Sequence, residues 1–205
     1  MINFTWWVNR KDVDGNNGFQ GCFLDLDNIG IFDLTETPAM GGCLEQADGT
    51  AWKAFYAQTM LRIAIELARN DETYREYSAK FMRHYLRITY AIVDDGSRVC
   101  MGDEEDGFFY NVLRTSDGSS IRLKIRSMVG LIPLCAVQIF EQDAMQQFPE
   151  RSDVLHRMQD FYSNNHTSFH DIMLEDHAGR HMMSALDEAN LRRVLKIMLD
   201  PDEFL

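Results

Sequence analysis

Three aspartates, Asp25, Asp27 and Asp33, lie among Leu, Ile and Phe in the segment GCFLDLDNIGIFD, which contains no Lys or Arg. A carboxyl group held in a partly apolar cleft has a raised pKa and can donate a proton as a general acid. The same pattern also fits a glycine-containing turn in which an aspartate caps the backbone. The segment therefore predicts either an acid catalyst or a turn, and its residues alone leave both open.

A second group of candidate residues lies near the N-terminus. Two adjacent tryptophans, Trp6 and Trp7, are followed by Asn9, Arg10 and Asp12. Flat aromatic rings stack on the C–H faces of sugars, and polar side chains beside them hydrogen-bond to the sugar hydroxyls. The pattern indicates a sugar-binding surface. A core tryptophan pair followed by a solvated charged turn is the alternative.

A third group, Glu45, Gln46 and Asp48, stands one turn before Trp52 at the start of a predicted helix. Carboxylates are favoured at this end of a helix because its first backbone N–H groups have no partner within the helix. Capping alone therefore explains these acids. Together with Trp52 they also form a second candidate surface for a sugar.

Neither a metal site nor a cofactor site is expected. The four-acid run 103–106 passes directly into aromatic residues and is either a solvated loop or the edge of a site. His166 and His170 are four residues apart, as are His177 and His181, but no H-E-x-x-H motif accompanies them. P-loop, G-x-G-x-x-G and G-x-S-x-G motifs are also missing, which leaves nucleotide binding and nucleophilic-serine chemistry without support.

Composition excludes further classes. The chain has 205 residues, of which 45% are hydrophobic, so a single region with a substantial core is expected. Its net charge of −12 would repel a nucleic-acid backbone. The longest apolar run, residues 128–136, is too short to cross a membrane. Isolated cysteines predict a reducing compartment, and we expect the cytoplasm; they are Cys22, Cys43, Cys100 and Cys135.

Helical periodicity dominates the elements that must position these residues. Apolar side chains recur every three or four positions from 50 to 70 and from 71 to 93, which predicts two amphipathic helices forming a hairpin. The apolar stripe of the first helix consists of Trp52, Phe55, Tyr56, Met60, Ile63, Ala64 and Leu67. That of the second consists of Tyr74, Tyr77, Phe81, Tyr85, Ile88 and Ile92.

The second half of the chain is predicted to be mostly helical as well. Residues 107–113 and 121–126 flank the turn SDGSS, and the second run alternates strictly as a half-buried strand does, which predicts a β-hairpin. Helices are expected at 129–148 and 150–162, and a last one should follow a capping box at Ser184 and Asp187. The expected fold is therefore mainly α, with one inserted β-hairpin.

Five segments, taken in order, resemble a known family. The segments are FTWWVNRKDVDGNN, LDLDNIGIFD, LEQADGTAW, DEEDGFFYNVL and KIRSMVGLIPL. They are similar to the bacterial glucosidase branch of glycoside hydrolase family 63, which has a mannosylglycerate-hydrolase-like domain, and the similarity runs from about Asn3 to Leu205. It implies an (α/α)6 toroid of helical hairpins and inverting hydrolysis of α-glycosidic bonds in an oligosaccharide or small glycoside.

The resemblance also implies roles for individual residues. Asp27 matches the family's general acid, with Asn28 beside it and Asp33 supporting the same loop. The family's general base lies beyond what aligns with Leu205, and five helices cannot close a ring of twelve. The chain is therefore expected to be an internal piece of a longer glycosidase. The alternative is a catalytically inactive helical remnant that binds sugar or protein.

Self-association is a further expectation. A partial toroid should expose the apolar faces of its end helices, which a complete ring would cover. The residues expected on these faces are Tyr77, Phe81 and Tyr85, or Leu191, Leu195 and Met198.

Overall fold

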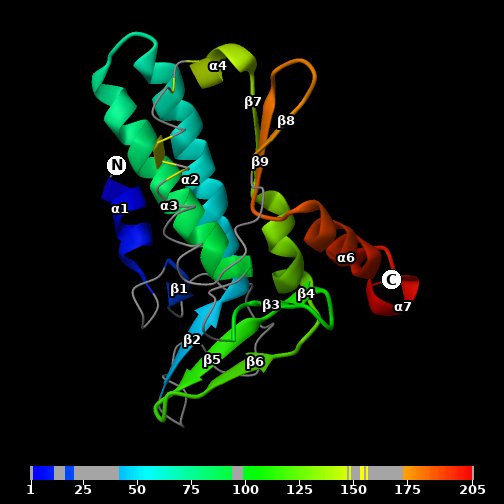
Figure 1. Cartoon of the computed structure of the whole chain (residues 1–205). Coiled ribbons are helices and arrows are strands. Elements are labelled where there is room, and N and C mark those ends of the chain that lie inside the picture. Colours follow the sequence, from blue (N-terminus) through cyan, green and yellow to red (C-terminus); the bar gives the residue numbers. More distant parts are fainter. Residues whose placement is uncertain are drawn as a thin grey trace.

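A computed structural model gives the architecture of most of the chain (Figure 1). The structure describes residues 2–11, 17–20, 42–93, 99–146, 148, 153–154, 156 and 173–204. Two long antiparallel helices lie side by side, a four-stranded sheet lies at one end of them, and a smaller sheet lies along one side. The short N-terminal helix α1 (Ile2–Asn9) lies beside the long pair.

The central element is the hairpin of α2 (Ala47–Ala68) and α3 (Thr73–Val93), which confirms the two helices expected from periodicity. The Asp71 carboxylate accepts a hydrogen bond from the backbone N–H of Thr73 at 2.9 Å, where the second helix begins. Small side chains on α2 allow α3 to pack closely against it, and Leu61 fills the same interface. The buried residues of this interface include Ala54, Ala57, Leu61, Phe81, Tyr85 and Ile88.

The predicted buried stripe of α2 is wrong for its largest members. Trp52, Phe55, Ile63 and Leu67 are all more than one-third exposed. These four side chains share one side of the helix, since their spacing is close to multiples of 3.6 residues. The opposite side, rich in alanine, packs against α3 and the 3₁₀ helix η1 (Met128–Cys135). Alpha2 is therefore apolar on two faces, and the face with the smaller residues is the buried one.

The larger sheet joins distant parts of the chain. Its antiparallel strands follow the order β1 (Phe19–Gln20), β2 (Gly42–Gln46), β5 (Asn111–Thr115) and β6 (Ser120–Leu123). The pair β5 and β6 confirms the predicted hairpin, which turns at Gly118 with a φ of +84°. Gly42 has a φ of +138°, and a Cβ atom there would lie 2.1 Å from the carbonyl oxygen of Arg114. No other residue type fits that position without moving β5.

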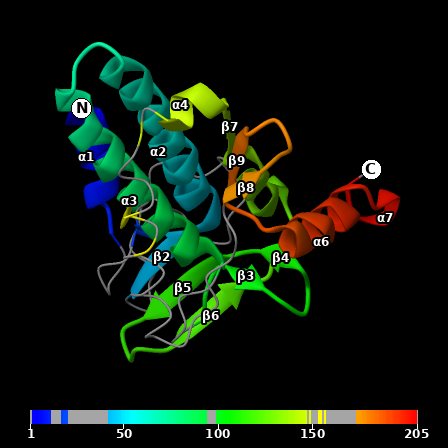
Figure 2. The same cartoon turned by 45° about the horizontal axis from the view of Figure 1, so that its top comes forward.

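Two smaller sheets complete the fold. Strands β3 (Gly102–Asp103) and β4 (Phe108–Phe109) form one pair, and β7 (Val137–Phe140), β9 (His181–Ser184) and β8 (Met173–Glu175) form a three-stranded sheet in that order. A short helix, α4 (Gln142–Gln146), follows β7. The C-terminal helices α6 (Glu188–Met198) and α7 (Pro201–Phe204) extend away from the long pair in both Figure 1 and Figure 2.

The expectation of a mainly α chain with one β-hairpin is therefore wrong, because the fold mixes helices with three antiparallel sheets. The predicted helix 129–148 is a 3₁₀ helix, a strand and a short helix in succession. Its apolar run suits both a helix and a buried strand, and Pro133 lacks the N–H that an inner turn of an α-helix needs. The last predicted helix is confirmed as α6, with Asp187 rather than Ser184 as its N-cap.

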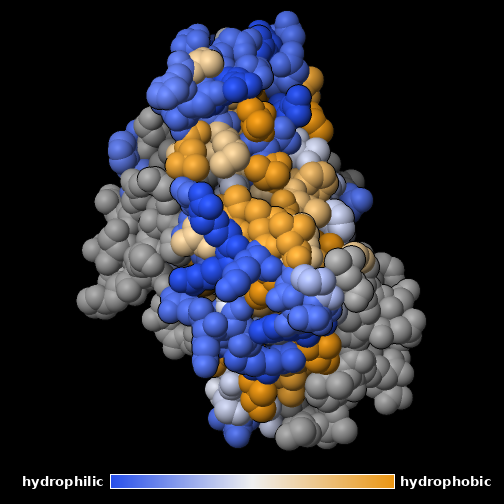
Figure 3. Space-filling view, turned by 90° about the vertical axis from the view of Figure 1, so that its right-hand side faces the viewer, coloured by the Kyte–Doolittle hydropathy of each residue, from blue (hydrophilic) through white to orange (hydrophobic). Residues whose placement is uncertain are grey.

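Of the two faces expected to be exposed, the first is wrong, because Phe81 and Tyr85 are buried in the core. On the second face Leu191, Leu195 and Met198 are half-buried, and self-association stays a prediction. Figure 3 shows instead an apolar area on the side that carries the three-stranded sheet. Its exposed residues there include Val137, Ile139 and Leu174, and Ile139 and Leu174 flank Met182 across the strands. None of the described helices is both long and apolar enough to span a lipid bilayer.

Candidate functional site

The two N-terminal tryptophans lie in different environments on α1. Trp6 is 43% exposed, and the guanidinium carbon of Arg10 lies 4.7 Å from the centre of its ring. Trp7 is half-buried, with its ring centre 5.6 Å from that of Phe19 and 6.2 Å from that of Tyr56. Trp6 is thus partly exposed with Arg10 over its ring, whereas Trp7 packs inward, and Asn9 is exposed on the same helix.

The junction of β2 and α2 buries three of the predicted polar residues, Glu45, Gln46 and Asp48. Glu45 forms an ion pair with Arg114, whose Nε and Nη2 atoms lie 2.9 Å and 2.8 Å from Glu45 Oε2. Both side chains are buried, so each charge depends on the other for compensation. Glu45 therefore has a structural role at this junction.

Capping at the start of α2 differs from the prediction. The backbone N–H of Ala47 donates to Asn111 Oδ1 at 2.8 Å, so a side chain from β5 caps the helix. Asp48 accepts from the backbone N–H of Gly49 at 2.7 Å. The side-chain amide of Gln46 is buried, and neither its nitrogen nor its oxygen makes a hydrogen bond among the described residues. A buried amide without partners is costly and often marks a place that a ligand or water occupies.

A buried lysine that the sequence analysis did not single out holds this region together. Lys53 is 1% exposed, and its Nζ atom donates to the backbone oxygens of Arg10 and Asn17 at 2.8 Å each and of Gly18 at 3.4 Å. It thereby fixes the chain after α1 against the first turns of α2. The one signal in the sequence is a lysine inside the otherwise apolar run AWKAFYA.

The remaining predicted residues divide into two groups. Trp52 is 37% exposed on α2, where its ring makes an edge contact with Phe55 at 6.0 Å, and no ring contact joins it to Trp6 or Trp7 among the described residues. Asp48 and Trp52 are four residues apart, so they share one side of the helix. The others, Asp12, Asp27, Asn28 and Asp33, lie outside the described residues.

Segments that are distant in sequence meet at the larger sheet. Residues 44–52 (LEQADGTAW) contact residues 103–113 (DEEDGFFYNVL) in two ways. Leu44 pairs with Leu113 across the strands, and the backbone N–H of Ala47 donates to the side chain of Asn111. FTWWVNRKDVDGNN reaches the same junction through Lys53. KIRSMVGLIPL contacts DEEDGFFYNVL through an ion pair between Lys124 and Asp103. Four of the five segments that carry the family resemblance therefore form one connected structure.

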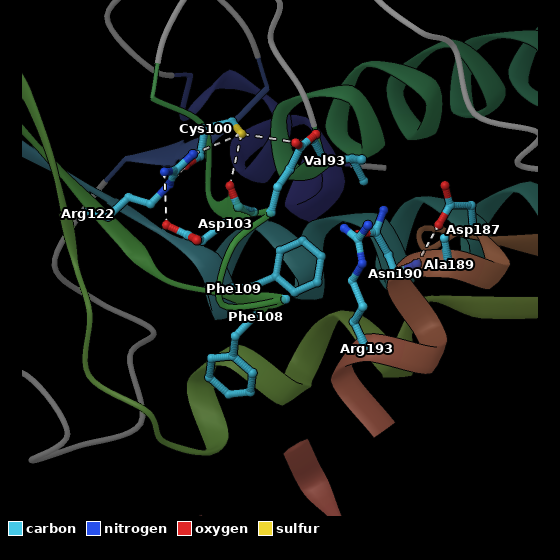
Figure 4. Close-up of a pocket in the computed structure, with 13 residues that line it drawn as sticks. Val93, Cys100, Asp103, Phe108, Phe109, Arg122, Asp187, Ala189, Asn190 and Arg193 are labelled. Atoms are coloured by element: carbon cyan, nitrogen blue, oxygen red, sulfur yellow. Dashed lines mark hydrogen bonds and ion pairs between the residues drawn. The ribbon is translucent and has the colours of Figure 1, made fainter. Parts of the chain in front are cut away.

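A pocket of about 280 Å³ opens beside this structure, between the β3–β4 pair, β6 and the start of α6 (Figure 4). The acidic run 103–106, predicted as a solvated loop or the edge of a site, contributes Asp103 and Glu104 here, whereas no pattern in the sequence indicated the other lining residues. The pocket lining includes Val93, Phe109, Asn190 and Arg193 and the carboxylates of Asp103, Glu104 and Asp187.

One wall of the pocket is electrostatically compensated. The buried Asp103 carboxylate lies 3.1 Å from Arg122 Nη1 and 2.9 Å from Lys124 Nζ, and it accepts from the backbone N–H of Asp106 at 2.9 Å. Burial alone would raise the pKa of Asp103, but the Asp106 N–H and the charges of Lys124 and Arg122 outweigh it and hold that pKa below its ordinary value. Hydrogen bonding to Lys124 likewise lowers the pKa of Asp106. These two carboxylates therefore stay ionised at neutral pH.

Two other chemical groups lie near this wall. The Cys100 thiol donates to the backbone oxygens of Gly102 at 3.2 Å and Val93 at 3.4 Å. On the α6 side, Arg193 and Asn190 reach into the pocket from successive turns of the helix (Figure 4). No cluster of three or more metal-ligating side chains occurs among the described residues, and His166 and His170 lie outside them.

Comparison with known proteins gives one relative to report. The chain is 37% identical over its whole length to "Uncharacterized protein YMR196W" of Saccharomyces cerevisiae. It spans about a fifth (20%) of the length of that relative, whose name states no activity. No protein-family model matches the chain. No solved structure matches it either.

Proposed function

We propose that this chain is part of an inverting α-glycoside hydrolase and supplies its general acid, Asp27. The observation that carries the proposal is the junction at β2 and α2, where segments of the family resemblance come together around buried polar residues. In particular, the Gln46 amide, which makes no hydrogen bond within the described part of the chain, is the kind of buried group that a sugar hydroxyl satisfies. The Trp6 ring on α1 is 43% exposed, and a sugar would stack on the part of it that Arg10 does not cover.

The described carboxylates narrow the choice of catalytic acid. Glu45 is held by Arg114, and Asp103 and Asp106 are held by Lys124. A general acid must carry its proton near neutral pH, whereas carboxylates paired with cations have lost theirs. The lowered pKa values of Asp103 and Asp106 make these two residues unsuited to this role, and we retain Asp27 as the proposed acid.

An inverting mechanism needs two carboxyl groups about 6.5–9.5 Å apart. In the proposed reaction, Asp27 protonates the departing glycosidic oxygen, while a second carboxylate removes a proton from the water that attacks the opposite face of the sugar. We place this second carboxylate in a segment beyond this chain. We also propose a cytoplasmic location, since the cysteines stand alone in the sequence.

A chimera tests this function. The chain would replace the matching segment of the yeast relative, and the chimera and the intact relative would be assayed on α-glucosides and α-mannosides. Proton NMR would identify the anomer released first, which should be the inverted β-anomer. Asp27→Asn in the chimera should lower kcat for unactivated glycosides by about 10²-fold or more, the usual value of general acid catalysis.

The matched control is Asp25→Asn, the same chemical change two residues earlier, which should leave most of the activity. Dinitrophenyl glycosides should suffer less from Asp27→Asn because their leaving group needs no proton. Retention of more than about a tenth of kcat on unactivated substrates would refute the role of Asp27. Release of no sugar by either the relative or the chimera would favour the inactive, sugar- or protein-binding remnant.

A further inference from the structure

The pocket in Figure 4 has two walls of different electrostatic character. On the sheet side, Asp103 is matched by Arg122 and Lys124. On the helix side, Arg193 contributes a positive charge for which the described part of the chain provides no hydrogen bond or ion pair. The neighbouring Arg192, by contrast, pairs with Glu188 at 2.7 Å one turn away. Among the described residues Arg193 thus makes no ion pair, although the carboxylates of Glu104 and Asp187 line the same pocket.

The geometry of the chain directs Arg193 into the pocket. Gly107 has a φ of +65°, and a Cβ atom on it would lie 2.9 Å from the Cβ of Arg193. The absence of a side chain at Gly107 therefore lets the stem of Arg193 lie directly against the β3–β4 turn. Figure 4 shows the guanidinium group lying beside the side chain of Asn190, with the Phe109 ring across from it.

Asn190 adds a second donor beside this cation. Its backbone N–H donates to Asp187 Oδ1 at 2.7 Å, which fixes the residue in the first turn of α6. The side-chain amide makes no hydrogen bond among the residues that the structure describes. A guanidinium fork next to an amide N–H matches the two coplanar oxygens of a carboxylate.

We propose that this pocket binds a small organic carboxylate. Its carboxylate would accept hydrogen bonds from Arg193 and Asn190, and its body would lie against the Phe109 ring and Val93. A volume of about 280 Å³ lies just below the range of about 300–1,000 Å³ that is usual for ligand pockets, so the ligand is small. Binding of this kind is independent of glycoside hydrolysis, and its test needs no turnover.

The negative charge of Glu104 should weaken the binding of a carboxylate, so removing that charge tests the proposal. It lines the same pocket and is exposed to solvent, so its charge repels an anion without being needed by a buried partner. Removing the charge of Glu104 should strengthen the binding of a carboxylate, whereas removing the charge of Arg193 should weaken it. Opposite responses at two residues of one pocket do not follow from loss of folding.

Titration of the purified chain with benzoate, followed by ligand-observed NMR, tests the proposal. Benzamide has the same shape without the charge and should bind at least about tenfold more weakly, as expected for the loss of a charge-assisted hydrogen bond. Added NaCl should weaken the binding of benzoate. Equal binding of benzoate and benzamide would overturn the proposal. Inorganic phosphate that binds here more tightly than benzoate would overturn the assignment to a carboxylate.

Substitutions in the same chain test whether benzoate binds in this pocket. Arg193→Gln should weaken benzoate binding by about tenfold or more, and Glu104→Gln should strengthen it severalfold. Arg192→Gln, the matched control on the outer side of the helix, should leave it unchanged. Circular dichroism would check that each variant is folded. If Arg193→Gln is unfolded, an unchanged affinity in Glu104→Gln would still overturn the proposal.

Discussion

Asp103→Asn should lower the free energy of unfolding by about 2 kcal/mol at pH 7. The carboxylate is 7% exposed and accepts from Arg122 at 3.1 Å and from the Asp106 N–H at 2.9 Å. A hydrogen bond to a charged group contributes about 1.5–3 kcal/mol when buried. Arg122 is 24% exposed, which favours the lower end of that range. The Asn side chain keeps an oxygen that can accept from the Asp106 N–H. The ion pair with the exposed Lys124 contributes little to the free energy of unfolding, because solvent screens it.

Urea unfolding followed by circular dichroism measures this change. A loss of about 2 kcal/mol in a chain of this size corresponds to a fall in Tm of about 4–8 °C. The matched control is Glu105→Gln in the same acidic run, where the side chain is exposed. It should change stability by less than about 0.5 kcal/mol.

The dependence on pH separates the charge of Asp103 from its shape. The pKa of Asp103 in the folded protein lies below its ordinary value of 3.8, since the Asp106 N–H and the two cations outweigh the effect of burial. The stability that depends on this charge is thus present above pH 3.8 and is lost as the pH falls through the folded-state pKa. The difference in free energy of unfolding between wild type and Asp103→Asn should be about 2 kcal/mol at pH 7 and should shrink towards zero at low pH. A difference that persists unchanged at low pH would refute the electrostatic reasoning.

Two further changes test other parts of the fold. Burial, with smaller contributions from nearby Lys and Arg side chains, lowers the pKa of His84 to about 4, so the unfolded chain takes up the proton first and stability falls from about pH 6.5 towards pH 4. His84→Phe should flatten this slope in urea unfolding at several pH values, and an unchanged slope would contradict it. Gly42→Ala places a Cβ against the Arg114 carbonyl, whereas Gly118→Ala meets open space. In urea unfolding, Gly42→Ala should therefore lower the free energy of unfolding by about 2 kcal/mol more than Gly118→Ala does. Equal losses in the two variants would contradict the close contact between Gly42 and the Arg114 carbonyl.

Local patterns were enough to predict the two hairpins. The turn at Gly118 is followed by a short alternating run, and α2 and α3 show long helical periods, so the signals come from neighbouring residues. The buried face of α2 was predicted wrongly because the pattern favours large apolar residues. Trp52 and Phe55 satisfy that pattern, yet close packing of two helices selects small residues such as Ala54 and Ala57.

The features that could not be predicted from the sequence depend on contacts between residues that lie far apart in the chain. The buried Gln58 amide donates to the carbonyl of Met183 at 3.0 Å, across 125 residues, and Glu45 pairs with Arg114 across 69. No local pattern indicates such partners. The acids at the start of α2 were recognised as notable, but their roles depend on strand β5. Arg193 gave no signal at all, since its position in a pocket depends on the turn at Gly107.

The nearly equal lengths of α2 and α3 have a consequence for folding. The two helices contain 22 and 21 residues and are joined by a short turn, so the chain that leaves β2 returns to nearly the same place after α3. Once this hairpin has formed, Ala47 and Asn111 are close in space although 64 residues separate them in sequence. Each helix forms through contacts between neighbouring residues. The chain entropy that closing the long loop costs is therefore lost gradually, as the helices form, and not in one step. We therefore expect that formation of the hairpin lowers the entropy cost of pairing β2 with β5.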